Sequence, residues 1–278
     1  MQKSFCCRNY KTSKHKTKEM NRLMSSISFL IDPAHSNNLS VSGDVGLMCE
    51  RLIPLVRACS KEWLHGWQKA ETAAQKAIAA WTTENFSEPT VARVLTSSLA
   101  VGGQLVVSSS MPIRDVEWFG SVTGGVTVHS NRGANGIDGV VSTAVGVALG
   151  SGSPTSLLIG DVALLHDVNG LLALNRRAVE VSIVVTNNDG GSIFSFLPQA
   201  EHLDQATFEL LYGTPHGVSF EHVAKTYGLS YFCASDEESL RSALAQSGTK
   251  IVEVVLDRSV NVSQHDELNS SIAAAVSA

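Results

Sequence analysis

Residues 155–161, Thr-Ser-Leu-Leu-Ile-Gly-Asp, and residues 181–191, Val-Ser-Ile-Val-Val-Thr-Asn-Asn-Asp-Gly-Gly, decide the fold of this chain. Each stretch begins with a short apolar run of strand length and ends in glycine, asparagine or aspartate. A helical pattern over residues 162–176 separates them. A strand, a helix and a second strand in this order are typical of a right-handed crossover within a parallel sheet.

The same alternation extends over most of the chain. We expect further strands at residues 104–107, 126–129, 229–232 and 251–256, and helices between the strands. Near-continuous apolar strands that alternate with helices predict an α/β fold, with a parallel sheet covered by helices on both faces. Ligands of such sheets bind beyond the carboxyl ends of the strands, so we expect the functional residues in the segments that follow the strands.

Four parts are distinguished by composition and pattern. Residues 1–25 form a basic leader that we expect to be disordered, and residues 26–83 hold a short strand, polar loop and two helical stretches at 45–60 and 61–81. The α/β domain covers residues 84–257, and residues 258–278 form a C-terminal tail.

The overall composition excludes several classes of protein. Of 278 residues, 44% are hydrophobic and 17% charged, which favours a packed core over global disorder. The net charge of −5 argues against a nucleic-acid partner, and no uninterrupted apolar run has the length of a membrane-spanning helix. The five cysteines lack C-x-x-C spacing, which argues against a zinc site or a disulfide framework and favours a reducing compartment.

The basic leader at residues 1–25 has more than one explanation. Residues 1–22 hold seven lysines and arginines but one acidic residue, Glu19, which resembles an organelle transit segment. A disordered start, or a start codon misplaced within a longer gene, explains the same pattern equally well. The expected location is the plastid if the protein comes from a plant, and the cytoplasm otherwise.

A metal site is predicted where two neighbouring strands end. Asp161 follows the strand at 155–159, and Asn188 follows the strand at 181–186, which is 27 residues (188 − 161) further on. Carboxylate, amide and backbone carbonyl oxygens together suit Mg²⁺ bound to a phosphate group. Alternatively, Gly-Asp caps a helix and Asn-Asp-Gly-Gly is an ordinary loop; the paired spacing favours the metal site.

Gly160-Asp161, followed after 25–30 residues by Asn187-Asn188, resembles the Mg²⁺–diphosphate motif of thiamine diphosphate enzymes, although Val162 replaces the usual third glycine. Three further segments are similar to one family of these enzymes, the 2-succinyl-5-enolpyruvyl-6-hydroxy-3-cyclohexene-1-carboxylate (SEPHCHC) synthases of menaquinone and phylloquinone biosynthesis. They are Ser-Ser-Ser-Met-Pro-Ile-Arg-Asp at 108–115, Ser-Asn-Arg-Gly-Ala-Asn-Gly-Ile-Asp-Gly at 130–139 and Gly-Ser-Ile-Phe-Ser-Phe-Leu-Pro at 191–198. The likeness covers about residues 84–257, and the fused plant protein is the most similar version.

The resemblance implies a transferase or carboligase with thiamine diphosphate and Mg²⁺ (or Mn²⁺) as cofactors. Such an enzyme decarboxylates 2-oxoglutarate and adds the succinyl carbanion equivalent to isochorismate. Both substrates are anionic, and arginine pairs bidentately with carboxylates. The resemblance assigns Ser110, Arg114 and Arg132 to substrate binding; a surface charge is the alternative for either arginine alone.

The resemblance also assigns the cofactor site. Metal ligands would be Asp161, Asn188 and the carbonyl of Gly190. Ile137 would support the bent cofactor, and an apolar wall would cover it. The cofactor-binding set is therefore Gly160, Asp161, Ile137, Asn188, Ile193, Phe194 and Leu197. For the four apolar residues of this set, core packing is the alternative.

The family's activating glutamate lies on a pyrimidine-binding domain, and no glutamate of this chain matches it, so the catalytic residue stays unknown. The resemblance implies that residues 26–83 are the tail of a central domain and a linker. It implies that the pyrimidine domain comes from the same family or a second subunit, and that the complete protein is a homo-oligomer. Three interpretations remain: part of a SEPHCHC synthase, another thiamine diphosphate carboligase or decarboxylase, or a non-catalytic binding or assembly module. The two arginine motifs argue against the second.

Overall fold

The computed structural model describes residues 41, 43–121, 124–131, 133 and 136–277, so the leader and the first part of the 26–83 segment lie outside the described residues. Two compact units divide between Leu64 and His65. In the first, α2 (Val45–Leu52) is capped by Asp44 and leads into the 3₁₀-helix η1 (Ile53–Leu55). The α-helical pattern over 45–60 ends early, at Leu52: Ile53 still has helical backbone, but Pro54 lacks the N–H that an α-helix would use there. Helix α3 (Glu62–Glu84) crosses the boundary between the units.

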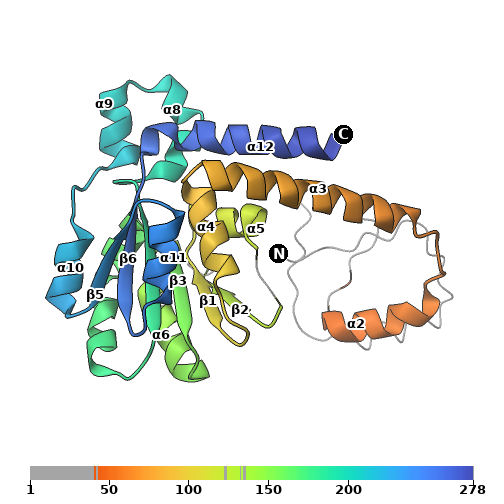
Figure 1. Ribbon diagram of the computed structural model, residues 1–278, viewed down its shortest axis with the longest axis horizontal. Coiled ribbons are helices and arrows are strands. Elements are labelled where there is room, and N and C mark those ends of the chain that lie inside the picture. Colours follow the sequence, from red (N-terminus) through yellow and green to blue (C-terminus); the bar gives the residue numbers. More distant parts are fainter. Residues whose placement is uncertain (1–40, 42, 122–123, 132, 134–135, 278) are drawn as a thin grey trace. The chain divides into compact units, whose positions relative to one another are not determined.

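The second unit is built on a six-stranded, all-parallel sheet (Figure 1). Its strand order is β2-β1-β3-β4-β6-β5. The strands are β1 (Gln104–Val107), β2 (Thr127–Ser130), β3 (Thr155–Gly160), β4 (Val181–Asn187), β5 (Ser230–Ala234) and β6 (Lys250–Val255). The sheet predicted from the apolar runs is confirmed, and each strand lies within two residues of its expected bounds.

Helices cover both faces because successive strand residues point to opposite sides. Leu157 and Ile159 pack into one core cluster, and Leu158, between them, packs into the other. The first cluster involves α6 (Val140–Ser151), α7 (Asp161–His166), the 3₁₀-helix η2 (Val168–Arg176) and α10 (Phe220–Tyr227). The second involves α4 (Glu88–Ser97), α5 (Met111–Phe119) and α11 (Glu237–Ala245).

The helical pattern over 162–176 is interrupted in the structure. Helix α7 ends at His166, and Asp167 turns away to accept a hydrogen bond from the Ser142 N–H at 2.7 Å, near the start of α6. Gly170 then passes close to α6: an added Cβ would lie 3.0 Å from Ser142 Oγ. The segment continues as η2, which lies against α6.

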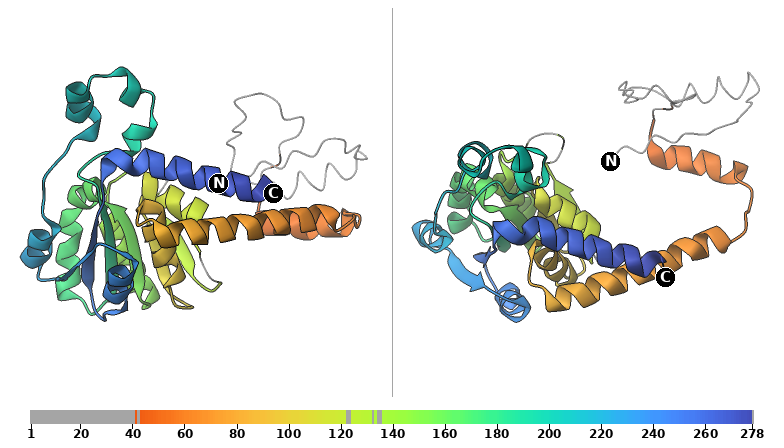
Figure 2. Two further views of the ribbon diagram at one scale, coloured as in Figure 1. Left: turned by 45° about the horizontal axis from the view of Figure 1, so that its top comes forward. Right: turned by 90° about the horizontal axis from the view of Figure 1, so that it is seen from above.

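The segment after β6 forms a long helix. The 3₁₀-helix η5 (Arg258–Val260) leads into α12 (Asn261–Ser277), which lies beside the C-terminal part of α3 (Figures 1 and 2). Leu268 of α12 packs with Ile78 of α3 and Phe119 of α5 in a third core cluster. Residues 258–278, which we expected to form a C-terminal tail, are thus part of the packed unit. Within the described part of the chain, no helix combines the length and apolar character needed to cross a membrane.

Candidate metal and diphosphate site

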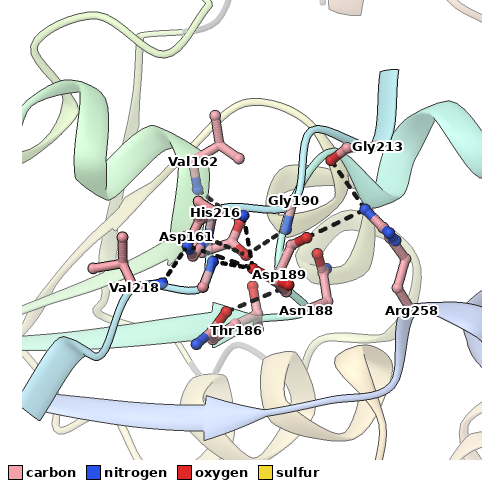
Figure 3. Close-up of polar contacts among 12 residues, drawn as sticks. Asp161, Val162, Thr186, Asn188, Asp189, Gly190, Gly213, His216, Val218 and Arg258 are labelled. Atoms are coloured by element: carbon pink, nitrogen blue, oxygen red, sulfur yellow. Dashed lines mark hydrogen bonds and ion pairs between the residues drawn. The ribbon is translucent and has the colours of Figure 1, made fainter. Parts of the chain in front are cut away.

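The carboxyl ends of β3 and β4 lie side by side. Gly160, the last residue of β3, is paired with Thr186 of β4, so Asp161 and the loop at 188–191 emerge at the same edge of the sheet. Figure 3 shows Asp161, Asn188, Asp189 and Gly190 in this one cluster. The expected convergence of two motifs that are 27 residues apart is therefore present.

Asp161 joins the two strand ends directly. It is the first residue of α7, and only 2% of it is exposed. Its Oδ1 accepts a hydrogen bond from the Val162 N–H at 2.6 Å, and its Oδ2 accepts one from the Gly190 N–H at 2.8 Å (Figure 3). The carboxylate therefore fixes the backbone of the loop that carries the other proposed metal ligands.

Gly190 allows this loop to pass very close to a neighbouring segment. The π-helix η4 (Glu209–Gly213) lies against the loop, and a Cβ added to Gly190 would lie 1.9 Å from the Gly213 carbonyl oxygen. The φ angle of Gly190 is +137°, a conformation that is essentially restricted to glycine. Arg258 donates from Nη1 to the carbonyls of Asp189 (3.2 Å) and Gly213 (2.9 Å), which holds the two segments together.

Asn188 offers an oxygen without a protein partner. Its Nδ2 donates to Glu88 Oε1 at 2.7 Å, and its Oδ1 is buried with no hydrogen bond to any described residue. A buried amide oxygen of this kind is costly unless a ligand satisfies it. Together with the nearby carboxylate of Asp161, it fits a cation that prefers oxygen ligands. The described residues contain no group of three or more His, Cys, Asp and Glu side chains suited to a metal, and the proposed set needs only one of these.

His216 also reaches the proposed site, although no motif singled it out. Its Nε2 lies 3.1 Å from Asp161 Oδ2. The backbone N–H groups of His216 and Gly217 donate to Asp189 Oδ1 at 2.9 and 2.8 Å, and the hydrogen bond from Gly217 contributes most to holding the pKa of Asp189 below its usual range. The segment before α10 is thereby tied to the loop through one carboxylate.

A buried polar network lies behind the loop. Glu88 is 4% exposed, and its Oε1 accepts from both Asn188 Nδ2 and Asn261 Nδ2, the latter at 3.1 Å. Asn261 Nδ2 also donates to Ser192 Oγ at 2.6 Å. Burial and then the nearby Asp115 carboxylate raise the pKa of Glu88 to about 7, against the lowering effect of its hydrogen bonds. No motif in the sequence singled out Glu88.

The substrate-binding residues expected from the resemblance are partly visible. Ser110 precedes α5 with a φ of +75°, an uncommon conformation for a residue other than glycine. Arg114 is half-buried, and its Nη1 donates to the Ser110 carbonyl at 2.6 Å. Both follow β1, which is paired with β3, so they start from the same edge as Asp161. Arg132 lies outside the described residues.

The proposed apolar wall lies in the 3₁₀-helix η3 (Ser192–Phe196) and just after it. Ile193 is half-buried, whereas Phe194 and Leu197 are 36% and 41% exposed. Exposed aromatic and aliphatic side chains beside a polar loop are typical of a surface that binds a ligand or a partner. Ile137 is half-buried and packs against the first core cluster, which agrees with its alternative role in the core.

Residues 121–257 match the family model of the thiamine pyrophosphate enzyme, C-terminal TPP binding domain. Two solved structures share this fold: benzoylformate decarboxylase from Polynucleobacter necessarius (TM-score 0.53, 20% identity, 61% of this chain and 33% of that one) and a Rhodococcus jostii thiamine diphosphate-dependent 4-hydroxybenzoylformate decarboxylase (TM-score 0.53, 18% identity, 62% and 33%). The fold is therefore that of the diphosphate domain of thiamine diphosphate enzymes.

Sequence relatives narrow this class. The chain is 42% identical over 254 residues to the SEPHCHC synthase of Myxococcus xanthus, an alignment that covers 89% of this chain and 43% of that enzyme. It is 46% identical over 209 residues to the synthase of Chloroflexus aurantiacus, with coverages of 73% and 35%. The chain is thus homologous to the C-terminal, cofactor-binding portion of SEPHCHC synthases, which confirms the resemblance, and it spans less than half the length of these relatives. The likeness to a fused plant protein stays a prediction.

Proposed function

We propose that this chain binds thiamine diphosphate and Mg²⁺ at the carboxyl edge of its sheet and supplies the diphosphate half of a SEPHCHC synthase active site. The observation that carries this proposal is the unpartnered, buried Oδ1 of Asn188 in the same cluster as the Asp161 carboxylate. The homology to SEPHCHC synthases supports it independently.

Within this proposal, Asp161, Asn188 and the carbonyl of Gly190 hold Mg²⁺ (or Mn²⁺), and Gly160 lets the diphosphate approach the backbone. Ile137 supports the cofactor, and Ile193, Phe194 and Leu197 exclude water from it. An apolar surrounding strengthens electrostatic interactions and favours the loss of charge as carbon dioxide departs. When bound, thiamine diphosphate supplies the electron sink for the decarboxylation of a 2-oxo acid.

The proposed substrates are 2-oxoglutarate and isochorismate, joined in a transferase reaction of menaquinone or phylloquinone biosynthesis. Ser110 and Arg114 lie at the correct sheet edge to orient a carboxylate, and Arg132 is the second proposed guanidinium. The activating glutamate would come from a pyrimidine domain of the same family, and the complete enzyme would be a homo-oligomer. A plastid location stays part of the proposal.

A non-catalytic binding or assembly module is the second candidate, because no glutamate of the sequence matches the activating glutamate of the family. Calorimetric titration with thiamine diphosphate, with and without Mg²⁺, tests the site. Turnover of 2-oxoglutarate with isochorismate, before and after addition of a separately expressed pyrimidine domain, then separates the candidates. Binding without turnover in either condition favours the module, whereas the absence of Mg²⁺-dependent binding overturns the proposed site.

A further inference from the structure

Glu88 is a buried carboxylate that contacts the proposed metal ligand Asn188 from α4. Glu88 opens α4 and is separated from Asn188 by 100 residues in the sequence, yet Asn188 Nδ2 donates to Glu88 Oε1 at 2.7 Å. The side chain is buried, so water does not compete for this hydrogen bond. A buried carboxylate that accepts a hydrogen bond from the Asn188 amide has a directional effect on that amide, even though the same oxygen also accepts from Asn261.

The direction follows from the chemistry of the amide group. A side-chain amide has a donating NH₂ and an accepting oxygen on opposite branches, and a carboxylate oxygen accepts. Contact with Glu88 therefore turns the NH₂ of Asn188 towards α4 and the Oδ1 away from it. That Oδ1 is the buried atom without a partner among the described residues. Without Glu88, no hydrogen bond from α4 would favour the orientation in which the Asn188 oxygen, rather than its nitrogen, points away from α4.

Glu88 is itself held in place by one further element, α12, and by the start of its own helix. Asn261, at the start of α12, donates Nδ2 to Glu88 Oε1 at 3.1 Å and to Ser192 Oγ of η3 at 2.6 Å. The start of α4 is fixed by a hydrogen bond between the hydroxyls of Ser87 and Thr90 at 3.0 Å. The carboxylate is thus a rigid reference point, which a residue that orients another side chain requires.

We propose that Glu88 is a positioning residue that orients the Asn188 amide so that its oxygen faces the metal; this rests on the proposed metal site. Groups that orient metal ligands contribute about 10–100-fold to metal affinity. Glu88 should therefore alter Mn²⁺ and thiamine diphosphate binding through Asn188 and not through its own charge.

Two substitutions distinguish the effect of the length of the Glu88 side chain from the effect of its charge. Glu88→Gln keeps the length of the side chain and an accepting oxygen, but removes the charge. Glu88→Asp keeps the charge, but withdraws the carboxylate by about 1.5 Å, one carbon–carbon bond. We expect Glu88→Gln to bind Mn²⁺ in the presence of thiamine diphosphate within about 3-fold of the wild type, and Glu88→Asp to bind about 10–100-fold more weakly. Glu84→Asp and Glu84→Gln, at the exposed end of α3, are matched controls that should change nothing.

The affinity is measured on the full chain at pH 8 by calorimetry and by the electron paramagnetic resonance signal of free Mn²⁺. The same Glu88→Asp change is then made in an Asn188→Ala background, where it should cause no further loss. A crystal structure of Glu88→Asp gives a readout that does not depend on affinity: the Asn188 amide should leave its wild-type orientation.

Each outcome bears on a distinct statement. Loss in Glu88→Gln with retention in Glu88→Asp would mean that the charge acts on the cation, and would overturn the positioning role. An equal loss with and without Asn188, or an unmoved Asn188 amide in the Glu88→Asp crystal, would overturn it as well. Unchanged affinity in Asn188→Ala and Asp161→Ala, or no Mn²⁺-dependent binding by the wild type, would instead overturn the proposed metal site itself.

Discussion

Replacement of Gly190 by alanine should distort the loop at 188–191, which carries the proposed metal ligands, while leaving the rest of the sheet in place. The new Cβ would lie 1.9 Å from the Gly213 carbonyl oxygen, and ordinary contacts begin at 3.4 Å, so one segment must move by 1.5 Å (3.4 − 1.9). That carbonyl accepts from the Gly191 N–H at 2.7 Å and from Arg258 Nη1 at 2.9 Å, and the movement breaks at least one of these bonds. Backbone strain of about 1–3 kcal/mol and a lost buried hydrogen bond of about 1–3 kcal/mol give roughly 2–6 kcal/mol.

If the loop moves to relieve this strain, ligand binding must return the loop to its original position, and the strain then reduces the binding free energy. Because about 1.4 kcal/mol corresponds to a tenfold change, Mg²⁺-dependent binding of thiamine diphosphate should weaken by roughly 30-fold or more. Gly150→Ala in α6 is the matched control: its Cβ meets nothing within 4 Å, and removing a helical glycine should stabilise the domain by about 0.5–1 kcal/mol. Calorimetric titration and urea unfolding measure both effects, and wild-type affinity in Gly190→Ala would refute the argument that this close approach shapes the site.

Three further changes have defined outcomes. Asp161→Ala should abolish Mg²⁺-dependent cofactor binding, and unchanged affinity in a titration would remove the metal assignment. Arg132→Ala should weaken the use of substrate in turnover assays while cofactor binding stays intact; an equal loss of both would show a structural role. Asp115→Asn should destabilise the domain by about 3–5 kcal/mol at pH 6, because it replaces the carboxylate that faces the buried His265, 2.8 Å away, by a neutral amide. Burial lowers the pKa of His265, but the hydrogen bond and charge of Asp115 outweigh it and raise that pKa, so the stabilisation is present below pH 6.5 and is lost as pH rises through the native value. Urea unfolding should therefore show a smaller effect of Asp115→Asn at pH 9, and an equal effect at both pH values would contradict this linkage.

The sheet could be predicted from the sequence because the signals for its strands are local. Each β-branched run, such as 181–186, is long enough to be recognised as a buried strand, and the polar residues directly after it mark the functional edge. The meeting of Asp161 with the loop at 188–191 follows from parallel pairing alone, since both strands end at the same edge. The early end of α7 was not predictable in this way, because it depends on the contact between Asp167 and Ser142.

Residues that support the site were missed for the same reason. Glu88 contacts Asn188 and Asn261, which are 100 and 173 residues away, and nothing in the local sequence distinguishes it from other acidic residues at helix starts. His216 approaches Asp161 from a segment without regular structure, across 55 residues. Only a motif that paired these positions would have found them.

Some residues that support the proposed site lie outside the part of the chain that the family model matches. The family model covers residues 121–257, which include Asp161, Asn188 and Gly190. Glu88 lies before this range, whereas Arg258 and Asn261 lie after it. Glu88 and Arg258 contact the loop at 188–191 directly, and Asn261 contacts Glu88. A chain cut to the matched range would keep every proposed metal ligand but lose β1 and the groups that fix their orientation. In the proposed cofactor site, the helices that flank the matched range therefore matter as well, because their residues contact Asn188 and the loop that carries it.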